Sequence, residues 1–178
     1  MPLRPAHAKA LAALALLTLA AAPTPLAAQA TGAYDGFFAG IDDGCRKGAA
    51  FEAWEKGLIA RFVPEAETAP ATPPPPEVAA TTGEPTAVDK GEWVEVAAPT
   101  FGTWRGLRLD RIVFSFGKQN GIYGFAVEFR EPAAAVATVF GAAVKRGKAR
   151  MAKEYAETGA STGIDTDGRV ALFCDFSN

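Results

Sequence analysis

Histidine is almost absent from this chain: its 178 residues include a single one, His7. His7 lies in an N-terminal stretch with the pattern of a cleavable signal peptide, so we expect the exported chain to contain no imidazole. Catalytic sites of the Ser-His-Asp and Cys-His types are then excluded, because both use an imidazole as the general base. The same absence removes a common metal ligand, and we expect neither a metal nor a cofactor.

Long hydrophobic runs are confined to the same N-terminal stretch. An apolar run of twelve residues, 11–22, has a helical length of about 18 Å, short of the ~30 Å hydrocarbon core of a membrane. Ala28-Gln29-Ala30 supplies the small residues that a signal peptidase needs. We therefore predict a signal peptide over residues 1–30, cleaved after Ala30, and a periplasmic or secreted bacterial protein without a transmembrane segment in its mature chain. An uncleaved membrane anchor is the alternative.

Positive charge is in deficit: 18 Lys and Arg stand against 20 Asp and Glu, a formal net charge of −2. Removal of residues 1–30 takes away Arg4 and Lys9 but no acid, which brings the net charge to −4. Nucleic-acid binding needs a basic face that displaces counterions, so we do not expect nucleic acid as a partner. The expected partner is an envelope protein, a glycan or an anionic surface.

Cysteine occurs twice, at Cys45 and Cys174, and neither residue belongs to a C-x-x-C pair. In an oxidising compartment such a pair predicts one disulfide, with two free thiols as the alternative. A loop of this length gives a stabilisation of about 4–5 kcal/mol as an upper value. The bond would join an N-terminal helical segment to the last strand of the chain.

The chain after the signal peptide divides into three segments by composition. Residues 31–63 form an N-terminal helical segment, in which Phe51, Trp54, Leu58 and Phe62 fall on one helical face. Residues 64–91 are rich in proline and lack aromatic residues, which predicts a flexible linker. A ligand for a proline-recognising domain is the alternative function of this linker. Residues 92–178 form an α+β body that the disulfide staples to the helical segment as one domain.

The α+β body is expected to contain about four strands and one packed helix. Residues 107–116 and 122–130 alternate apolar and polar positions around Asn120-Gly121, which predicts an antiparallel hairpin with a tight turn. Strands are also expected over 92–97 and 170–176. A helix is expected to start at Pro132, and the sequence leaves its end open, at Gly141, at Gly147 or beyond. The predicted fold is an antiparallel sheet with one helix, preceded by the helical segment and the linker.

One basic stretch is the strongest local charge bias and the first candidate binding surface. It consists of Lys145, Arg146, Lys148, Arg150 and Lys153. Such a cluster attracts anionic partners such as lipid headgroups or acidic proteins. The alternative is a helix C-terminus, whose dipole favours cations, followed by a solvated loop.

Two glycine-rich segments beside the predicted hairpin form a second candidate. The first contains Trp104 and Arg105, and the second contains Asn120 and Tyr123. Loops on a rigid scaffold often carry recognition residues. The aromatic residues in these segments are equally typical of a buried core.

Three acidic pairs complete the candidates. The adjacent pair Asp42-Asp43 is typical of a helix cap or turn. Asp110 and Glu128 lie on opposing arms of the hairpin, where they could act as paired carboxylates or belong to a solvated face. The sequence Asp165-x-Asp167-Gly168 resembles the start of a calcium loop but lacks the downstream glutamate.

These observations favour a non-enzymatic binding or interaction module over an enzyme, because no convergent catalytic motif is present. Two other functions stay open. One is a glycan-acting enzyme that depends on two carboxylates, for which Asp110 and Glu128 are the candidates. The other is a structural envelope protein without a soluble ligand.

Overall fold

The computed structural model describes residues 32–63 and 72–177. The predicted signal peptide and residues 64–71 of the predicted linker lie outside this part of the chain. Within it, no helix combines the length and the apolar composition that crossing a membrane requires.

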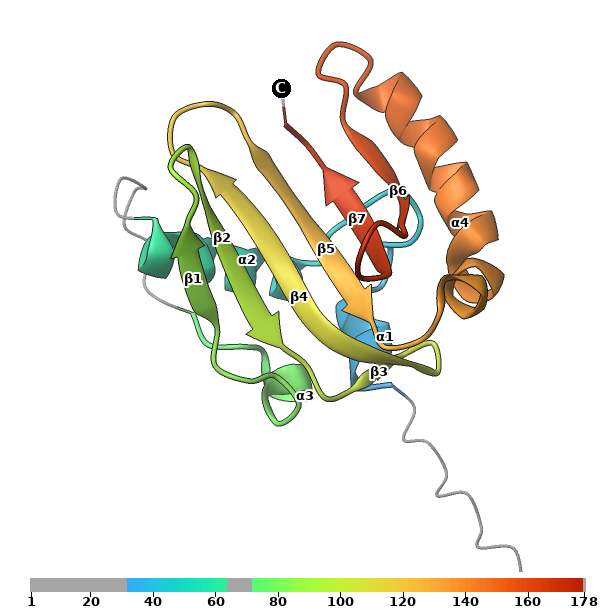
Figure 1. Ribbon diagram of the computed structural model, residues 1–178, viewed down its shortest axis with the longest axis horizontal. Helices are drawn as coiled ribbons and strands as arrows, with labels where there is room; N and C mark the ends of the chain where they lie inside the picture. Colours follow the sequence, from blue (N-terminus) through green and yellow to red (C-terminus); the bar gives the residue numbers. More distant parts are fainter. Residues whose placement is uncertain (1–31, 64–71, 178) are drawn as a thin grey trace, which may run out of the picture.

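Seven strands form one antiparallel sheet, in the order β1-β2-β4-β5-β7-β6, with β3 paired to the start of β4 (Figure 1). The α+β class is thereby confirmed, while the sheet is larger than the expected four strands. The four expected strands are β2, β4, β5 and β7, which occupy the middle of the sheet. The strands are β1 (Thr86–Asp89), β2 (Trp93–Pro99), β3 (Thr103–Trp104), β4 (Leu107–Gly117), β5 (Tyr123–Phe129), β6 (Ser161–Asp165) and β7 (Ala171–Asp175).

The helices pack against one face of this sheet. In Figure 1, α1 (Ala33–Phe37) and α2 (Ala49–Phe62) lie behind the strands, and α4 (Ala133–Glu154) runs beside β6. A short helix, α3 (Pro76–Ala79), precedes β1. The long helix expected after Pro132 starts at Ala133 and passes through both glycines that could have ended it. The single expected body helix is therefore present, and its end, which the sequence left open, is Glu154.

Aromatic side chains build the core between the helices and the sheet. The ring of Phe51 on α2 lies 4.8 Å from that of Phe125 on β5. The ring of Trp104 lies 4.8 Å from that of Phe38 and 4.4 Å from that of Phe140 on α4. One continuous cluster of buried residues thus contains side chains from α1, α2, α4 and the sheet.

The predicted disulfide is confirmed: Cys45 and Cys174 are bonded, with their Cα atoms 5.8 Å apart. Cys45 lies between α1 and α2, and Cys174 lies in β7. The bond therefore links the N-terminal helices to the sheet across 129 residues of sequence.

Regular structure extends into the segment that we expected to be a flexible linker. Val78 in α3 is fully buried, and Thr86–Asp89 pair with β2 as strand β1. All four residues of β1 are exposed, so the strand is held by backbone hydrogen bonds and has no buried apolar side chain. A prediction from composition depends on buried apolar side chains, so it misses a strand that has none.

The opposite face of the sheet is covered by none of the four helices (Figure 1). Along β2, buried residues alternate with the half-buried Trp93, Glu95 and Ala97. The half-buried set belongs to this uncovered surface, which we call the open face.

Candidate functional site

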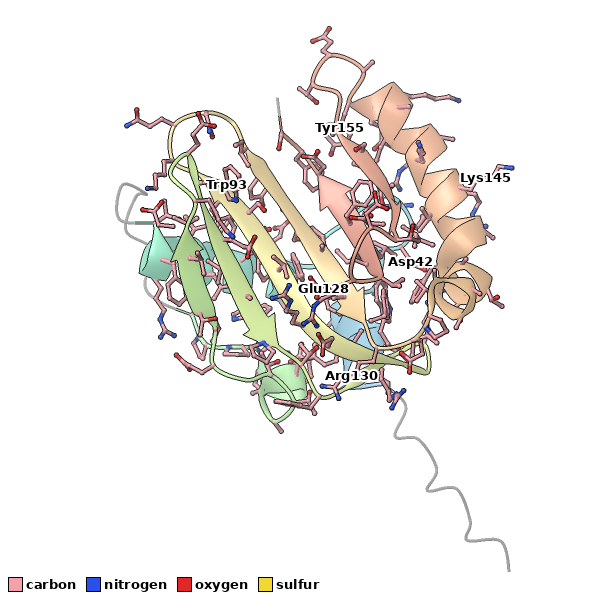
Figure 2. All side chains as sticks on the ribbon, viewed as in Figure 1. Asp42, Trp93, Glu128, Arg130, Lys145 and Tyr155 are labelled. Atoms are coloured by element: carbon pink, nitrogen blue, oxygen red, sulfur yellow. A yellow bond between two sulfur atoms is a disulfide. The ribbon has the colours of Figure 1, made fainter. Side chains whose placement is uncertain are left out.

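The basic stretch lies on α4 and, with one exception, on its outer side. Lys145, Arg146, Lys148 and Lys153 are exposed, and Lys145 extends away from the sheet in Figure 2. Successive residues of a helix are rotated by about 100°, which centres these four cations opposite the buried side of the helix. We call the four residues the basic face of α4. The buried side consists of Val136, Phe140, Ala143, Val144, Gly147 and Met151.

The basic face has no acidic partner in the part of the chain that the structure describes. None of its four cations forms an ion pair with a residue in 32–63 or 72–177. On the same side of the helix, Thr138 and Ala142 precede these cations and Ala149 and Ala152 lie between them; all four are small and exposed. The outer side of α4 therefore offers positive charge without a large apolar residue.

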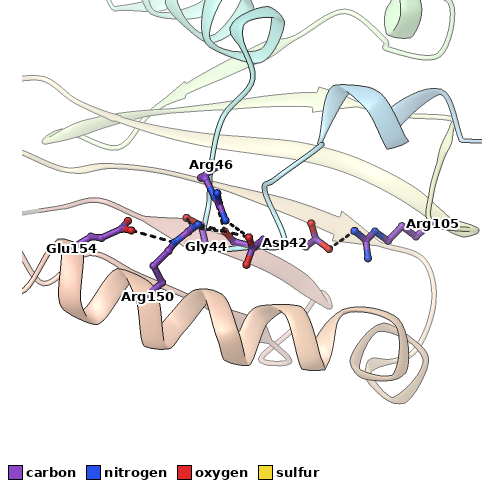
Figure 3. Close-up of polar contacts among 7 residues, drawn as sticks. Asp42, Gly44, Arg46, Arg105, Arg150 and Glu154 are labelled. Carbon is purple, nitrogen blue, oxygen red and sulfur yellow. Dashed lines mark hydrogen bonds and ion pairs between the residues drawn. The ribbon is translucent and has the colours of Figure 1, made fainter.

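Arg150 is the exception, because its guanidinium turns toward the loop between α1 and α2 (Figure 3). One of its Nη atoms donates to the carbonyl oxygens of Asp43 and Gly44, the latter at 2.8 Å. Its Nε lies 3.6 Å from a carboxylate oxygen of Glu154. Arg150 therefore holds this loop against α4 and is not part of the basic face.

Trp104 packs in the core, and Arg105 lies in a turn. Trp104 is buried in the core. Arg105 has a positive φ of 48° in the two-residue turn between β3 and β4, and its backbone N–H donates to Oδ1 of Asp35 at 2.7 Å. Its guanidinium lies 2.8 Å from Oδ2 of the buried Asp42 (Figure 3). These contacts tie α1 and the following loop to the sheet and leave no recognition role for Trp104.

Asn120 and Tyr123 lie at the other end of β4. The eleven residues of β4 separate Asn120 and Tyr123 from Trp104 and Arg105 by roughly 35 Å. The structure therefore does not bring the two predicted loop segments together. Asn120 and Tyr123 do line one cavity of about 330 Å³ beside the end of α2.

The Tyr123 hydroxyl accepts a hydrogen bond from Lys47, whose Nζ also lies 2.8 Å from a carboxylate oxygen of Glu55. Burial, and then the negative charge of Glu55, raise the pKa of Tyr123 above its usual value. Tyr123 therefore belongs to a buried polar cluster and offers only part of its ring to the cavity.

The hairpin acids Asp110 and Glu128 are both bound by arginines on the open face. Arg111 makes two hydrogen bonds to Glu128, at 2.8 and 2.9 Å, and these raise the pKa of the Arg111 guanidinium. Asp110 is paired with Arg130 at 3.4 Å and with Arg169. The acids thus alternate with arginines in a charge network, in which Asp110 is partly exposed and Glu128 is buried.

The remaining acidic pairs also have local partners. Asp42 pairs with Arg105, whereas Asp43 pairs with Arg46, so the two adjacent carboxylates do not act as a unit. A carboxylate oxygen of Asp165 accepts the backbone N–H of Asp167 at 2.9 Å, which is a turn contact. In the described part of the chain, no three acidic, histidine or cysteine residues gather as metal ligands would.

A groove on the open face was not predicted from the sequence. It has a volume of about 350 Å³ and crosses the middle of the sheet beside Trp93. The signal that could have shown it is the run of small residues between the apolar positions of the strands, namely Ser115, Gly124 and Ala126. Their alignment depends on the register between strands, which no single strand reveals.

Comparison with known proteins gives no family: no family model matches the chain, and no curated protein or solved structure resembles it significantly.

Proposed function

We propose that this chain is an exported, non-enzymatic binding module that attaches to an anionic lipid surface of the cell envelope through the basic face of α4. The observation that carries this proposal is the set of four exposed cations that lack an acidic partner among the described residues. Most other cations of the molecule are paired, for example Arg111 with Glu128 and Lys118 with Asp89. The positive charge of α4 is therefore concentrated on one side of a chain that is acidic as a whole.

The proposed attachment is electrostatic and does not involve insertion. Helices that insert into a membrane interface expose large apolar residues such as Trp, Phe or Leu. The large apolar residues of α4, including Phe140 and Met151, are buried in the core. The outer side offers only alanine and threonine beside its cations, which allows close approach to a charged plane. Binding should therefore weaken steeply with salt.

Each lysine or arginine held near an anionic membrane contributes about 1 kcal/mol. Four such residues give about 4 kcal/mol, which corresponds to roughly a thousandfold in affinity at low salt. The protein should therefore sediment with vesicles that contain phosphatidylglycerol and not with vesicles of phosphatidylcholine alone. The variant Lys145→Gln, Arg146→Gln, Lys148→Gln, Lys153→Gln should lose most of this association.

A matched control removes four positive charges elsewhere: Arg46→Gln, Lys56→Gln, Arg61→Gln and Arg108→Gln, all exposed. This control should keep most of the association, because it leaves the basic face intact. Equal loss in both variants would show that net charge alone governs binding and would reject the proposal. Binding to an anionic polysaccharide without binding to the vesicles would also reject the lipid surface, in favour of a glycan.

A further inference from the structure

The groove on the open face is a second site whose chemistry differs from that of the basic face. It crosses β2, β4, β5 and β7, and the strand register sets its floor. Glu95 pairs with Ser115, Ser115 with Gly124, and Gly124 with Asp175. Adjacent strands are about 4.8 Å apart, so this row places one carboxylate residue at each end of a span of roughly 14 Å.

Small side chains in the middle of this row leave space above the sheet. Ser115 and Gly124 lie between the two acids, and Ala126 lies one row further along β5. Phe173 forms a side wall, and its ring leans over β6, where a Cβ added to Gly163 would lie 2.7 Å from it. Trp93, at the start of β2, forms another wall (Figure 2). The result is a channel with a floor of small residues, aromatic walls and an acid at either end.

The lining of the groove carries negative charge only. Among residues 32–63 and 72–177, its ionisable lining residues are Glu95 and Asp175, and none of its lining residues is a lysine or arginine. Outside the groove, Lys90 forms an ion pair with Glu95 at 3.8 Å, and Arg111 also interacts electrostatically with Glu95, so a ligand ammonium would compete with both. Asp175 accepts the backbone N–H of Ser177 at 2.9 Å. Aromatic faces such as that of Trp93 also attract cations. The charge of the groove thus complements a cationic ligand with an apolar middle.

We propose that this groove binds a linear aliphatic polyamine. One ammonium group pairs with Glu95 and lies beside the ring of Trp93. The methylene chain crosses the floor formed by Ser115, Gly124 and Ala126. A second ammonium group pairs with Asp175. The proposal is independent of the membrane attachment, because it uses a different surface of the molecule.

Chain length provides the first test, by calorimetric titration of the protein at low salt with 1,4-diaminobutane, 1,8-diaminooctane and spermidine. Affinity should rise with the separation of the two charges, because a short diamine reaches one carboxylate only. Trp93 is the one tryptophan that is not buried in the core, so binding should change the tryptophan fluorescence, and Trp93→Phe should abolish that change.

Substitution of the acids provides the second test. Glu95→Gln and Asp175→Asn should each weaken spermidine binding about tenfold, the usual effect of losing one charged hydrogen bond. Glu157→Gln and Asp167→Asn are matched controls, since both residues are exposed and lie outside the groove. These controls should bind spermidine as the unmodified protein does.

Three results would overturn the proposal. The first is the absence of saturable binding at millimolar spermidine. The second is an equal loss of affinity in the groove variants and the control variants, which would indicate attraction by net charge. The third is stronger binding of a neutral oligosaccharide than of any diamine, which would identify the aromatic walls as a sugar platform.

Discussion

Lys47 connects three parts of the molecule through one ammonium group. Its Nζ contacts Glu55 on α2 and the hydroxyl of Tyr123 on β5, and lies 5.2 Å from the centre of the Phe176 ring beyond β7. The side chain of Lys47 is 14% exposed and that of Glu55 only 4%. Burying such a pair costs desolvation energy, so its value lies more in fixing the position of α2 than in net stability.

One buried tyrosine, Tyr34, and one half-buried tyrosine, Tyr123, should make the protein lose stability at high pH. Burial raises the pKa of Tyr34 and of Tyr123. In the unfolded chain a tyrosine loses its proton near about pH 10. Above that pH the folded protein binds more protons than the unfolded chain, so the free energy of unfolding falls as pH rises, by up to about 1.4 kcal/mol per pH unit for each tyrosine.

Urea unfolding from about pH 8 to about pH 11 measures this loss. The variant Tyr34→Phe, Tyr123→Phe should be less stable near neutral pH, because it loses the hydrogen bonds of both hydroxyls. Its stability should nevertheless fall less steeply above about pH 10. Parallel curves for the two proteins over that range would show that these tyrosines do not set the pH dependence.

At the scale of elements, α4 approaches the loop between α1 and α2 unusually closely, through Gly147. A Cβ at this position would lie 2.7 Å from the Cα of Gly44, which is backbone and cannot yield as a side chain can. Gly147→Ala should therefore destabilise the protein by about 1–3 kcal/mol, the usual cost of overpacking, despite the higher helix propensity of alanine.

Gly141 is the matched control in the same helix, because nothing lies within 4 Å of an added Cβ there. Gly141→Ala should stabilise the protein by up to about 1 kcal/mol, the difference in helix propensity between the two residues. Thermal unfolding of both variants measures the pair of effects. A Gly147→Ala variant as stable as Gly141→Ala would show that the loop moves away from α4 at no cost.

The sequence predicted those helices and strands whose formation depends mainly on their own residues and less on tertiary contacts. The alternating aromatic residues predicted the hairpin of β4 and β5, and the pairing of Phe114 with Phe125 confirms it. The tight turn expected at Asn120-Gly121 is instead a five-residue connection, 118–122, in which Gly121 has a positive φ of 72°. The strands β1, β3 and β6 were missed. β1 and β6 are short and are held at the edges of the sheet by a neighbouring strand, and β3 has only two residues. The sequence did not predict where α4 ends, because Gly147 resembles a helix stop. Its role is instead to allow close contact with a loop about 100 residues away in sequence.

The same distinction holds for the candidate sites. The basic stretch was visible as composition, whereas the inward turn of Arg150 follows from the carbonyl oxygens of Asp43 and Gly44, which only the fold brings near. The open-face groove depends on residues from four strands, of which β2, β4 and β5 precede α4 in sequence and β7 follows it. The orientation of Arg150 and the position of the groove therefore depend on tertiary contacts, which the local sequence pattern does not reveal.

At the scale of the whole molecule, the disulfide links the two ends of the described chain. Cys45 has a positive φ of 61° and follows Gly44 at 75°, so the loop reaches β7 through two consecutive residues in the left-handed region. The bond closes a loop of 129 residues, for which the chain-entropy account gives a stabilisation of about 4–5 kcal/mol. This value comes from restricting the unfolded chain and is largely independent of contacts in the folded state.

The variant Cys45→Ala, Cys174→Ala should therefore fold with its core intact but lose up to about 4 kcal/mol of unfolding free energy. Folding should persist because Phe51 and Trp54 on α2 still pack on Phe114 of the sheet, with ring centres 5.8 and 5.5 Å apart. Urea unfolding, followed by tryptophan fluorescence, measures the loss. A reducing agent should lower the stability of the unmodified protein to that of the variant and leave the variant unchanged. If the two proteins were equally stable before reduction, contacts within the core alone would hold the N-terminal helices on the sheet.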